Sequence, residues 1–238
     1  MKQSFNYVKK DKDGNPRYTE VYMDVTNKCN ALCKWCLTGR ANLEKKTEGQ
    51  PIYNMTKENF QALVEHLLDH KIVTDDACFR IYNWYEPSLN PELPEIINYC
   101  AEKGVSIDIS TNCGVRIDFS RVKTTEHLKG FLFSMPGFSQ ESYNRIHKFN
   151  FERVKDNIRY SVKELRAKGF TGDIYINYHL YQFNLGEVMA AKAFADELGI
   201  RFHSIYAYFN GTGESKKYLE DTLTLSELKE ASKDLFFH

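Results

Sequence analysis

The stretch "YTEVYMDVTNKCNALCKWC", residues 18–36, joins a predicted strand to three closely spaced cysteines. Its first half, Tyr18 to Thr26, alternates and is rich in β-branched and aromatic residues, which is typical of a β-strand. Cys29, Cys33 and Cys36 follow at spacings of four and three residues. We therefore expect the three thiols just beyond the carboxyl end of the first strand.

Beyond the cysteines, predicted helices alternate with predicted strands. Thr56 caps a helix with one apolar stripe, and further strands are predicted at residues 77–83, 105–111, 130–135, 173–181 and 201–209. Thr224 and Glu227 form a capping box that begins a last helix. Six strands that alternate with helices favour parallel pairing, in a doubly wound sheet or a closed or partial (β/α) barrel. In both folds, ligands bind at the carboxyl ends of the strands.

No Pro- or Gly-rich linker divides the chain, so one domain is predicted over residues 18–238, after an N-terminal extension of residues 1–17. The polar stretch from Leu37 to Asn54 reads as a long loop, either a cover for a site or a solvated insertion.

Composition limits the classes of partner. The 238 residues carry no formal net charge, and the basic residues are scattered, which argues against nucleic acid. We find neither a membrane-length apolar run nor the apolar segment of a signal peptide, so no membrane partner and a cytoplasmic location are expected. In that reducing compartment, clustered cysteines are metal ligands or catalytic thiols rather than disulfides.

Three thiols at these spacings leave two kinds of metal site open. A structural zinc site usually takes four ligands, and only Cys113, at the end of the third predicted strand, is placed to supply the fourth. Three thiolates alone suit a four-iron cluster in which one iron stays open for a ligand or substrate. An open iron would make the site reactive rather than structural.

The pattern CxxxCxxC after the first strand of such a domain resembles the radical S-adenosylmethionine (radical SAM) superfamily, and Trp35 is the aromatic residue that this family favours before the last cysteine. The resemblance spans roughly residues 18 to 210. It implies a partial (β/α)6 TIM-like barrel, one 4Fe-4S cluster on Cys29, Cys33 and Cys36, and S-adenosylmethionine on the open iron.

Later strand ends carry further parts of the resemblance, in "NWYEP" (residues 83–87), "STNC" (110–113) and "SMPG" (134–137). His147 stands where the family often has an arginine for the cofactor carboxylate; the alternative is a solvated residue at a helix start. The residues that the resemblance places near S-adenosylmethionine are Trp35, Glu86, Ser110, Asn112, Ser134, His147, Asn177 and Tyr206. Tyr85, Tyr178, His179 and Tyr181 are further candidates for the pocket wall, although strand alternation points half of such residues away.

The resemblance implies that reductive cleavage of S-adenosylmethionine gives a 5′-deoxyadenosyl radical, which takes a hydrogen atom from a substrate. The chain is most similar to the barrels of the SPASM and twitch group, so a peptide, a protein residue or a related small molecule is the expected substrate, with epimerisation, crosslinking or oxidation as the outcome. A flavodoxin or ferredoxin would supply the electron. Cys113 is a candidate hydrogen-atom donor or, alternatively, a small buried apolar residue.

Two other functions remain open: an activase for a glycyl-radical enzyme, and a non-catalytic metal-binding module. No cysteine follows Phe209, so either one cluster suffices or a C-terminal extension is missing.

Overall fold

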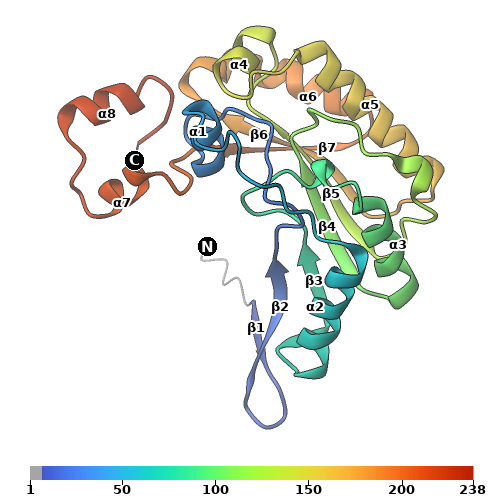
Figure 1. Cartoon of the computed structure of the whole chain (residues 1–238). Helices are drawn as coiled ribbons and strands as arrows, with labels where there is room; N and C mark the ends of the chain where they lie inside the picture. The colour runs from blue at the N-terminus through green and yellow to red at the C-terminus, as the bar shows by residue number, and fades with distance from the viewer. Residues whose placement is uncertain (1–6, 238) are drawn as a thin grey trace.

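A curled sheet of seven strands forms the centre of the molecule (Figure 1), in a computed structural model that describes residues 7–237. The strands lie side by side in chain order, and β2 to β7 pair in parallel. Their bounds are Val8–Lys10 (β1), Pro16–Tyr22 (β2), Val73–Arg80 (β3), Ser106–Thr111 (β4), Leu128–Met135 (β5), Asp173–Leu180 (β6) and Arg201–Tyr206 (β7). The predicted partial barrel of six parallel strands is confirmed as an open half-barrel.

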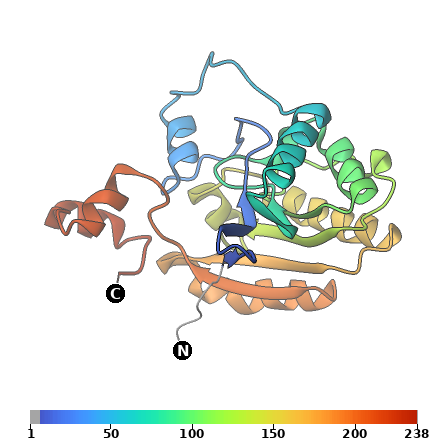
Figure 2. The ribbon, with the colours of Figure 1, turned by 90° about the horizontal axis from the view of Figure 1, so that it is seen from below.

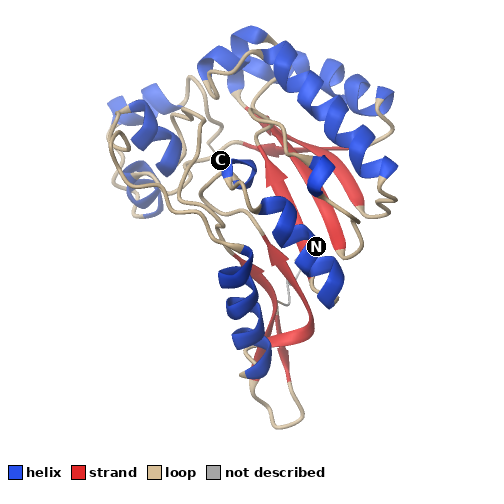
Figure 3. Cartoon of the chain, turned by 45° about the vertical axis from the view of Figure 1, so that its right-hand side comes forward, coloured by secondary structure: helices blue, strands red, loops and turns tan. Residues whose placement is uncertain are grey.

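Four helices cover the outer face of this sheet: α2 (Lys57–Asp69), α3 (Leu93–Lys103), α5 (Phe151–Ala167) and α6 (Val188–Glu197). Figure 3 shows the strands as one curved layer with these helices along its outside. Thr56 caps α2 as predicted, because its hydroxyl accepts a hydrogen bond from the Asn59 amide at 3.2 Å. The apolar stripes of the helices and the outward side chains of the strands form the main core.

The edge of the sheet and the first loop differ from the sequence prediction. Residues 8–10, expected within an extension, form β1 and pair antiparallel with the start of β2. The first parallel strand ends at Tyr22 rather than Thr26, because β3 ends at Arg80 and offers no further ladder partners. Met23 and Val25 nevertheless stay buried, which is why the alternating pattern continues past the strand.

The stretch Leu37 to Asn54 is not wholly irregular, because helix α1 occupies Leu37–Leu43. Gly39 lies so close to Cys33 that a Cβ atom there would come within 2.5 Å of the Cys33 backbone nitrogen. Only glycine allows that contact, so α1 is packed directly onto the cysteine loop, residues 29–36.

Three short helices complete the fold: α4 (Gln140–Arg145), α7 (Gly213–Leu219) and α8 (Leu225–Ala231). Helices α7 and α8 belong to a C-terminal segment that lies beside α1 rather than on the helical layer (Figures 1 and 2). A second, smaller core joins this segment to the cysteine loop and consists of Trp35, Ile146, Tyr181, Ala207, Phe209, Ala231 and Leu235. Among residues 7–237, no helix has the length and apolar character needed to cross a bilayer.

Candidate functional site

A cavity of about 200 Å³ opens at the carboxyl ends of the parallel strands. Its wall is built from the loops that follow β2 to β7, as expected for ligand sites in α/β barrels. The lining residues are Cys29, Ala31, Cys33, Trp35, Cys36, Tyr82, Asn83, Trp84, Tyr85, Glu86, Ser110, Thr111, Asn112, Ser134, Ile146, His147, His179, Tyr181, Ala207, Tyr208 and Asn210. All three cysteines of the CxxxCxxC pattern therefore face the same space.

The cysteine loop is held in place by hydrogen bonds to its backbone. The side-chain amide of Asn42 donates to the carbonyl oxygens of Cys29 and Ala31, at 2.9 and 3.0 Å. The backbone of Asn210 donates to Trp35 and accepts from Leu37, each at 2.8 Å. Helix α1 and the chain after β7 thus fix the path of the loop.

The half-buried thiols of Cys29 and Cys33 ionise less readily than an exposed thiol. Burial raises the pKa of Cys29 to about 12, with a further contribution from the carboxylate of Glu86. Burial also raises the pKa of Cys33 well above its ordinary value. Coordination to iron or zinc offsets such a shift because a cation stabilises the thiolate.

Three thiols on one space are the ligand set that a cubane cluster with one open iron takes. In the part of the chain that the structure describes, no three His, Cys, Asp or Glu side chains converge closely enough to bind one metal ion. In a cubane cluster each thiolate ligates a different iron, so the three sulfur atoms need only surround a shared space. Cys29, Cys33 and Cys36 do so around this cavity.

The loop "NWYEP" forms one wall of the cavity, and the carboxylate of Asp24 holds it in place through hydrogen bonds to its backbone. One carboxylate oxygen, Oδ1, accepts hydrogen bonds from the backbone amides of Asn83, Trp84 and Tyr85 at 3.1, 3.0 and 3.0 Å. The amide of Glu86 donates to the carbonyl oxygen of Lys28 at 3.0 Å, which ties the loop to the start of the cysteine loop.

Glu86 lines the cavity, and its carboxylate accepts hydrogen bonds from residues at the end of β4. It accepts hydrogen bonds from the Thr111 hydroxyl and the Asn112 amide, both at 2.7 Å, and from the Ser88 amide at 3.0 Å. Burial raises the pKa of Glu86, and these hydrogen bonds oppose that shift. In this position the side chain joins the ends of β3 and β4.

The other predicted strand-end residues Ser110, Asn112 and Ser134 also reach the cavity. The side-chain amide of Asn112 donates to Asn30 Oδ1 at 2.8 Å and lies 3.9 Å from Cys29 Sγ. Asn112 is thus the residue that connects the cysteine loop to the end of β4.

Two histidines face the cavity as neutral rings. Burial lowers the pKa of His147 to about 3 and that of His179 to about 4. His147 is only 5% exposed, so the alternative of a solvated helix-start residue is wrong. Its Nδ1 atom is buried and has no hydrogen-bond partner among the described residues, which makes it a polar group that a ligand could satisfy.

Some of the candidate residues lie elsewhere. Asn177 lies on the inner face of β6, between His179 and His203, and Tyr206 contacts Phe236; neither lines the cavity. Tyr178 points outward into the main core, as strand alternation requires, whereas Tyr85, His179 and Tyr181 do reach the cavity.

Cys113 is 2% exposed and also lies in the main core, outside the cavity wall. Its position matches the alternative reading as a small buried residue.

Asp24 and the segment from Ala207 to Asn210 were not predicted as parts of the site. Both follow a parallel strand, so position beyond a carboxyl end was the available signal.

The open parallel half-barrel, the CxxxCxxC loop after its first parallel strand and the motifs at later strand ends are the features in which the chain resembles the radical SAM superfamily. No protein-family model matches the chain.

Two curated proteins resemble it in sequence. The Fe-coproporphyrin III synthase of Methanosarcina barkeri is 24% identical over 216 residues, which cover 89% of this chain and 49% of that protein. The 7,8-dihydro-6-hydroxymethylpterin dimethyltransferase of Methanocaldococcus jannaschii is 23% identical over 214 residues, which cover 86% of this chain and 39% of that protein. The chain thus spans half or less of the length of these relatives.

Among solved structures, Streptococcus suis SuiB superposes with a TM-score of 0.61 at 13% identity, over 88% of this chain and 47% of SuiB. At that identity the likeness concerns the fold.

Proposed function

We propose that Cys29, Cys33 and Cys36 hold one 4Fe-4S cluster and that S-adenosylmethionine occupies the adjoining cavity. The observation that carries this proposal is the convergence of three thiols with the "NWYEP" loop and the ends of β4 and β5 on one space. When bound, the cofactors supply one-electron cleavage of the sulfonium, which yields methionine and a 5′-deoxyadenosyl radical able to take a hydrogen atom from a substrate carbon.

In this proposal the residues of the cavity wall bind and orient S-adenosylmethionine and shield it from water. Ser110, Asn112 and Ser134 offer hydroxyl and amide groups along one wall, where a nucleoside needs hydrogen-bond partners. Trp84 and Tyr181 supply aromatic surface that excludes water from a reactive intermediate.

His147 binds the methionine carboxylate as a neutral donor. Its pKa of about 3 keeps the ring uncharged at neutral pH, so it contributes a hydrogen bond rather than the charge of an arginine. The buried, unpartnered Nδ1 supports a ligand at this ring.

The substrate in this proposal is a peptide, a protein residue or a related small molecule, and a flavodoxin or ferredoxin delivers the electron. SuiB has been crystallised with its precursor peptide SuiA, and anSMEcpe, whose TM-score is 0.53, with a Cp18Cys peptide. The curated relatives are named for a coproporphyrin and a pterin, which keeps small molecules within the class.

The test is anaerobic reconstitution with iron and sulfide. We expect a brown protein with about four irons per chain, which forms 5′-deoxyadenosine when given dithionite and S-adenosylmethionine. Cys33→Ala should abolish this product. Cys100→Ala is the matched control, because Cys100 is a fully buried free cysteine of α3 outside the cavity.

A colourless protein that binds one zinc per chain would refute the proposal. A brown protein that never cleaves S-adenosylmethionine would indicate a non-catalytic metal-binding module instead.

A further inference from the structure

The C-terminal segment, residues 212–237, follows β7 in the chain but is bonded to α1 and the cysteine loop, which follow β2. Arg40 of α1 pairs with Glu214, and Lys34 of the cysteine loop pairs with Glu230 at 3.0 Å. Both pairs are at least partly exposed, so each contributes little by itself. The buried contacts that join the same elements centre on one residue, Asp234.

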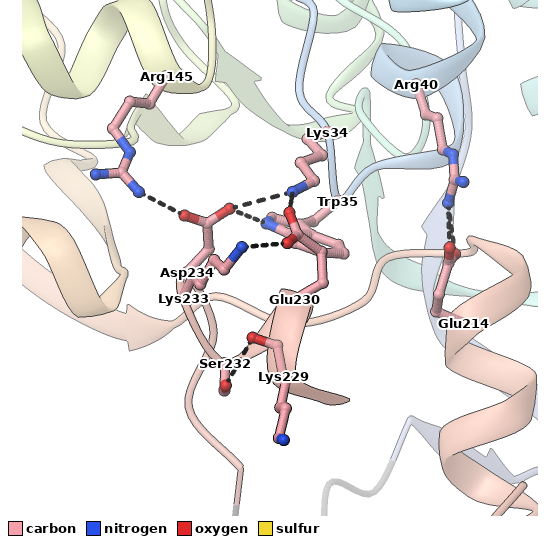
Figure 4. Close-up of polar contacts among 10 residues, drawn as sticks. All are labelled: Lys34, Trp35, Arg40, Arg145, Glu214, Lys229, Glu230, Ser232, Lys233 and Asp234. Carbon is pink, nitrogen blue, oxygen red and sulfur yellow. Dashed lines mark hydrogen bonds and ion pairs between the residues drawn. The ribbon is translucent and has the colours of Figure 1, made fainter. Parts of the chain in front are cut away.

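The carboxylate of Asp234 accepts hydrogen bonds from the cysteine loop and from the end of α4 (Figure 4). The indole Nε1 of Trp35 donates to Oδ2 at 3.1 Å, and the guanidinium of Arg145 donates to Oδ1 at 2.8 Å. The ammonium of Lys34 lies 3.7 Å from Oδ2. The backbone oxygen of Asp234 also accepts from the amide of Gln182 at 2.8 Å.

Each of these partners is adjacent in sequence to a cavity residue. Trp35 lies directly before Cys36, Arg145 directly before Ile146, and Gln182 directly after Tyr181. Asp234 therefore connects the cysteine loop, the end of α4 and the loop after β6, which are three separate parts of the cavity wall.

The hydrogen bond between Asp234 and Trp35 is buried, so its loss would destabilise the contact between the C-terminal segment and the cysteine loop. Asp234 is 7% exposed and Trp35 is 5% exposed. The indole packs edge-on against Phe209 with ring centroids 5.5 Å apart, and the partly buried side chain of Cys33 packs against the same small core. A buried indole N–H that lost its acceptor would have to reach water, which requires the small core to open, whereas the Arg145 side chain is 39% exposed and can bond water directly.

We propose that Asp234 is a positioning residue for the cluster. It fixes the indole of Trp35, and the fixed indole orders the loop that carries Cys33 and Cys36 and closes the Cys33 side of the cavity against solvent. No part of Asp234 contacts a cysteine in this arrangement, so it acts through Trp35. The role in cluster retention rests on the proposed function, whereas the hold on Trp35 does not.

The first experiment measures the indole in the metal-free protein. The chain has two tryptophans, so a Trp84→Phe background leaves Trp35 as the only tryptophan, which is excited selectively over the tyrosines. We expect Asp234→Ala to shift the emission of Trp35 to the red and to raise its quenching by acrylamide several-fold. Asp234→Asn retains one acceptor oxygen for Nε1 and should fall between Asp234→Ala and the parent.

The matched control is Glu230→Gln, which breaks the exposed pair with Lys34 in the same segment and leaves Asp234 intact. Its emission and quenching should equal those of the parent. An unchanged indole in both Asp234 variants, or an equal change in Glu230→Gln, would overturn the proposal. If circular dichroism shows that Asp234→Ala is unfolded, Asp234→Asn decides the question by itself.

The second experiment uses the reconstituted protein with both tryptophans present and follows iron release to a chelator under anaerobic conditions. Loss of the hydrogen bond between the Asp234 carboxylate and Trp35 alone predicts release about tenfold faster in Asp234→Ala. Equal release rates in Asp234→Ala and the parent would refute the role in cluster retention. If the parent takes up no iron, the proposed function fails, while the fluorescence result still decides whether Asp234 positions Trp35.

Discussion

The support of the "NWYEP" loop by Asp24 can be tested directly. Three consecutive backbone amides, those of Asn83, Trp84 and Tyr85, donate to Oδ1 of this half-buried carboxylate, and the Trp84 amide also lies 3.2 Å from Oδ2. Few other contacts could hold these amides in place. Asp24→Ala should therefore free this wall of the cavity while the barrel stays folded.

The magnitude follows from the number and kind of hydrogen bonds. A hydrogen bond to a charged group contributes about 1.5–3 kcal/mol. The three donors share one oxygen, and water can replace it in a half-buried loop, so we expect a local loss of about 2–4 kcal/mol rather than the full sum. Asp24→Asn keeps an oxygen at the Oδ1 position but removes the charge, which should cost about half as much.

Amide hydrogen exchange in the metal-free protein measures this local free energy. A loss of 2–4 kcal/mol corresponds to exchange roughly 30-fold to several hundred-fold faster at residues 83–85. Asp118→Ala is the control, because Asp118 makes a similar side-chain bond to the Ser120 amide at 3.1 Å in another loop. Unchanged exchange at residues 83–85 in Asp24→Ala, or a larger effect of Asp24→Asn than of Asp24→Ala, would refute the reasoning.

Three further predictions concern buried groups around the site. Burial lowers the pKa of His147 to about 3. Below about pH 6.5 the unfolded chain therefore binds a proton that the folded chain does not, so the free energy of unfolding decreases as the pH is lowered. The free energy of unfolding in urea should drop by about 2 kcal/mol more between pH 7 and pH 5 in the parent than in His147→Gln. Cys113→Ala should keep 5′-deoxyadenosine formation, because Cys113 lies in the core rather than on the cavity, and should cost about 1 kcal/mol in urea unfolding. Asn184→Asp should destabilise the fold by about 3 kcal/mol in the same assay, because the lost amide donates to the carbonyl oxygens of Pro136 and His179, both at 2.8 Å, and an acceptor would face them instead.

The framework of the fold was predictable because its signals are local. Runs of apolar and β-branched residues located all six parallel strands, with β3 beginning at Val73 rather than Ala77. The hydroxyl of Thr56 and the capping box at Thr224 located two helix starts. Because parallel strands place their carboxyl ends at one edge, the spacing of the cysteines and the motifs after β3, β4 and β5 also placed most of the cavity wall.

The rest of the site depends on contacts between distant parts of the chain, which leave no periodic pattern. Asp24 reaches a loop about 60 residues away, and Asp234 reaches Trp35 across 199 positions. Helix α1 was missed for a related reason, since it is short and is held by Gly39 packing on Cys33 rather than by a repeated apolar stripe. His147 was difficult because a ring at the end of a short helix is solvated or buried depending on what packs over it.

These contacts also bear on how the cysteine loop and its metal depend on each other. The loop is held through backbone oxygens bonded by Asn42, through the backbone of Asn210 and through the indole of Trp35, and none of these bonds uses a thiol. Replacing the thiol of Cys33 by alanine therefore removes a proposed metal ligand without removing any of these hydrogen bonds. For this reason, a loss of iron in Cys33→Ala reports on coordination, whereas a loss of iron in Asp234→Ala reports on the position of the loop. The emission of the Trp35 indole separates the two causes, because only Asp234→Ala removes the acceptor of the indole N–H.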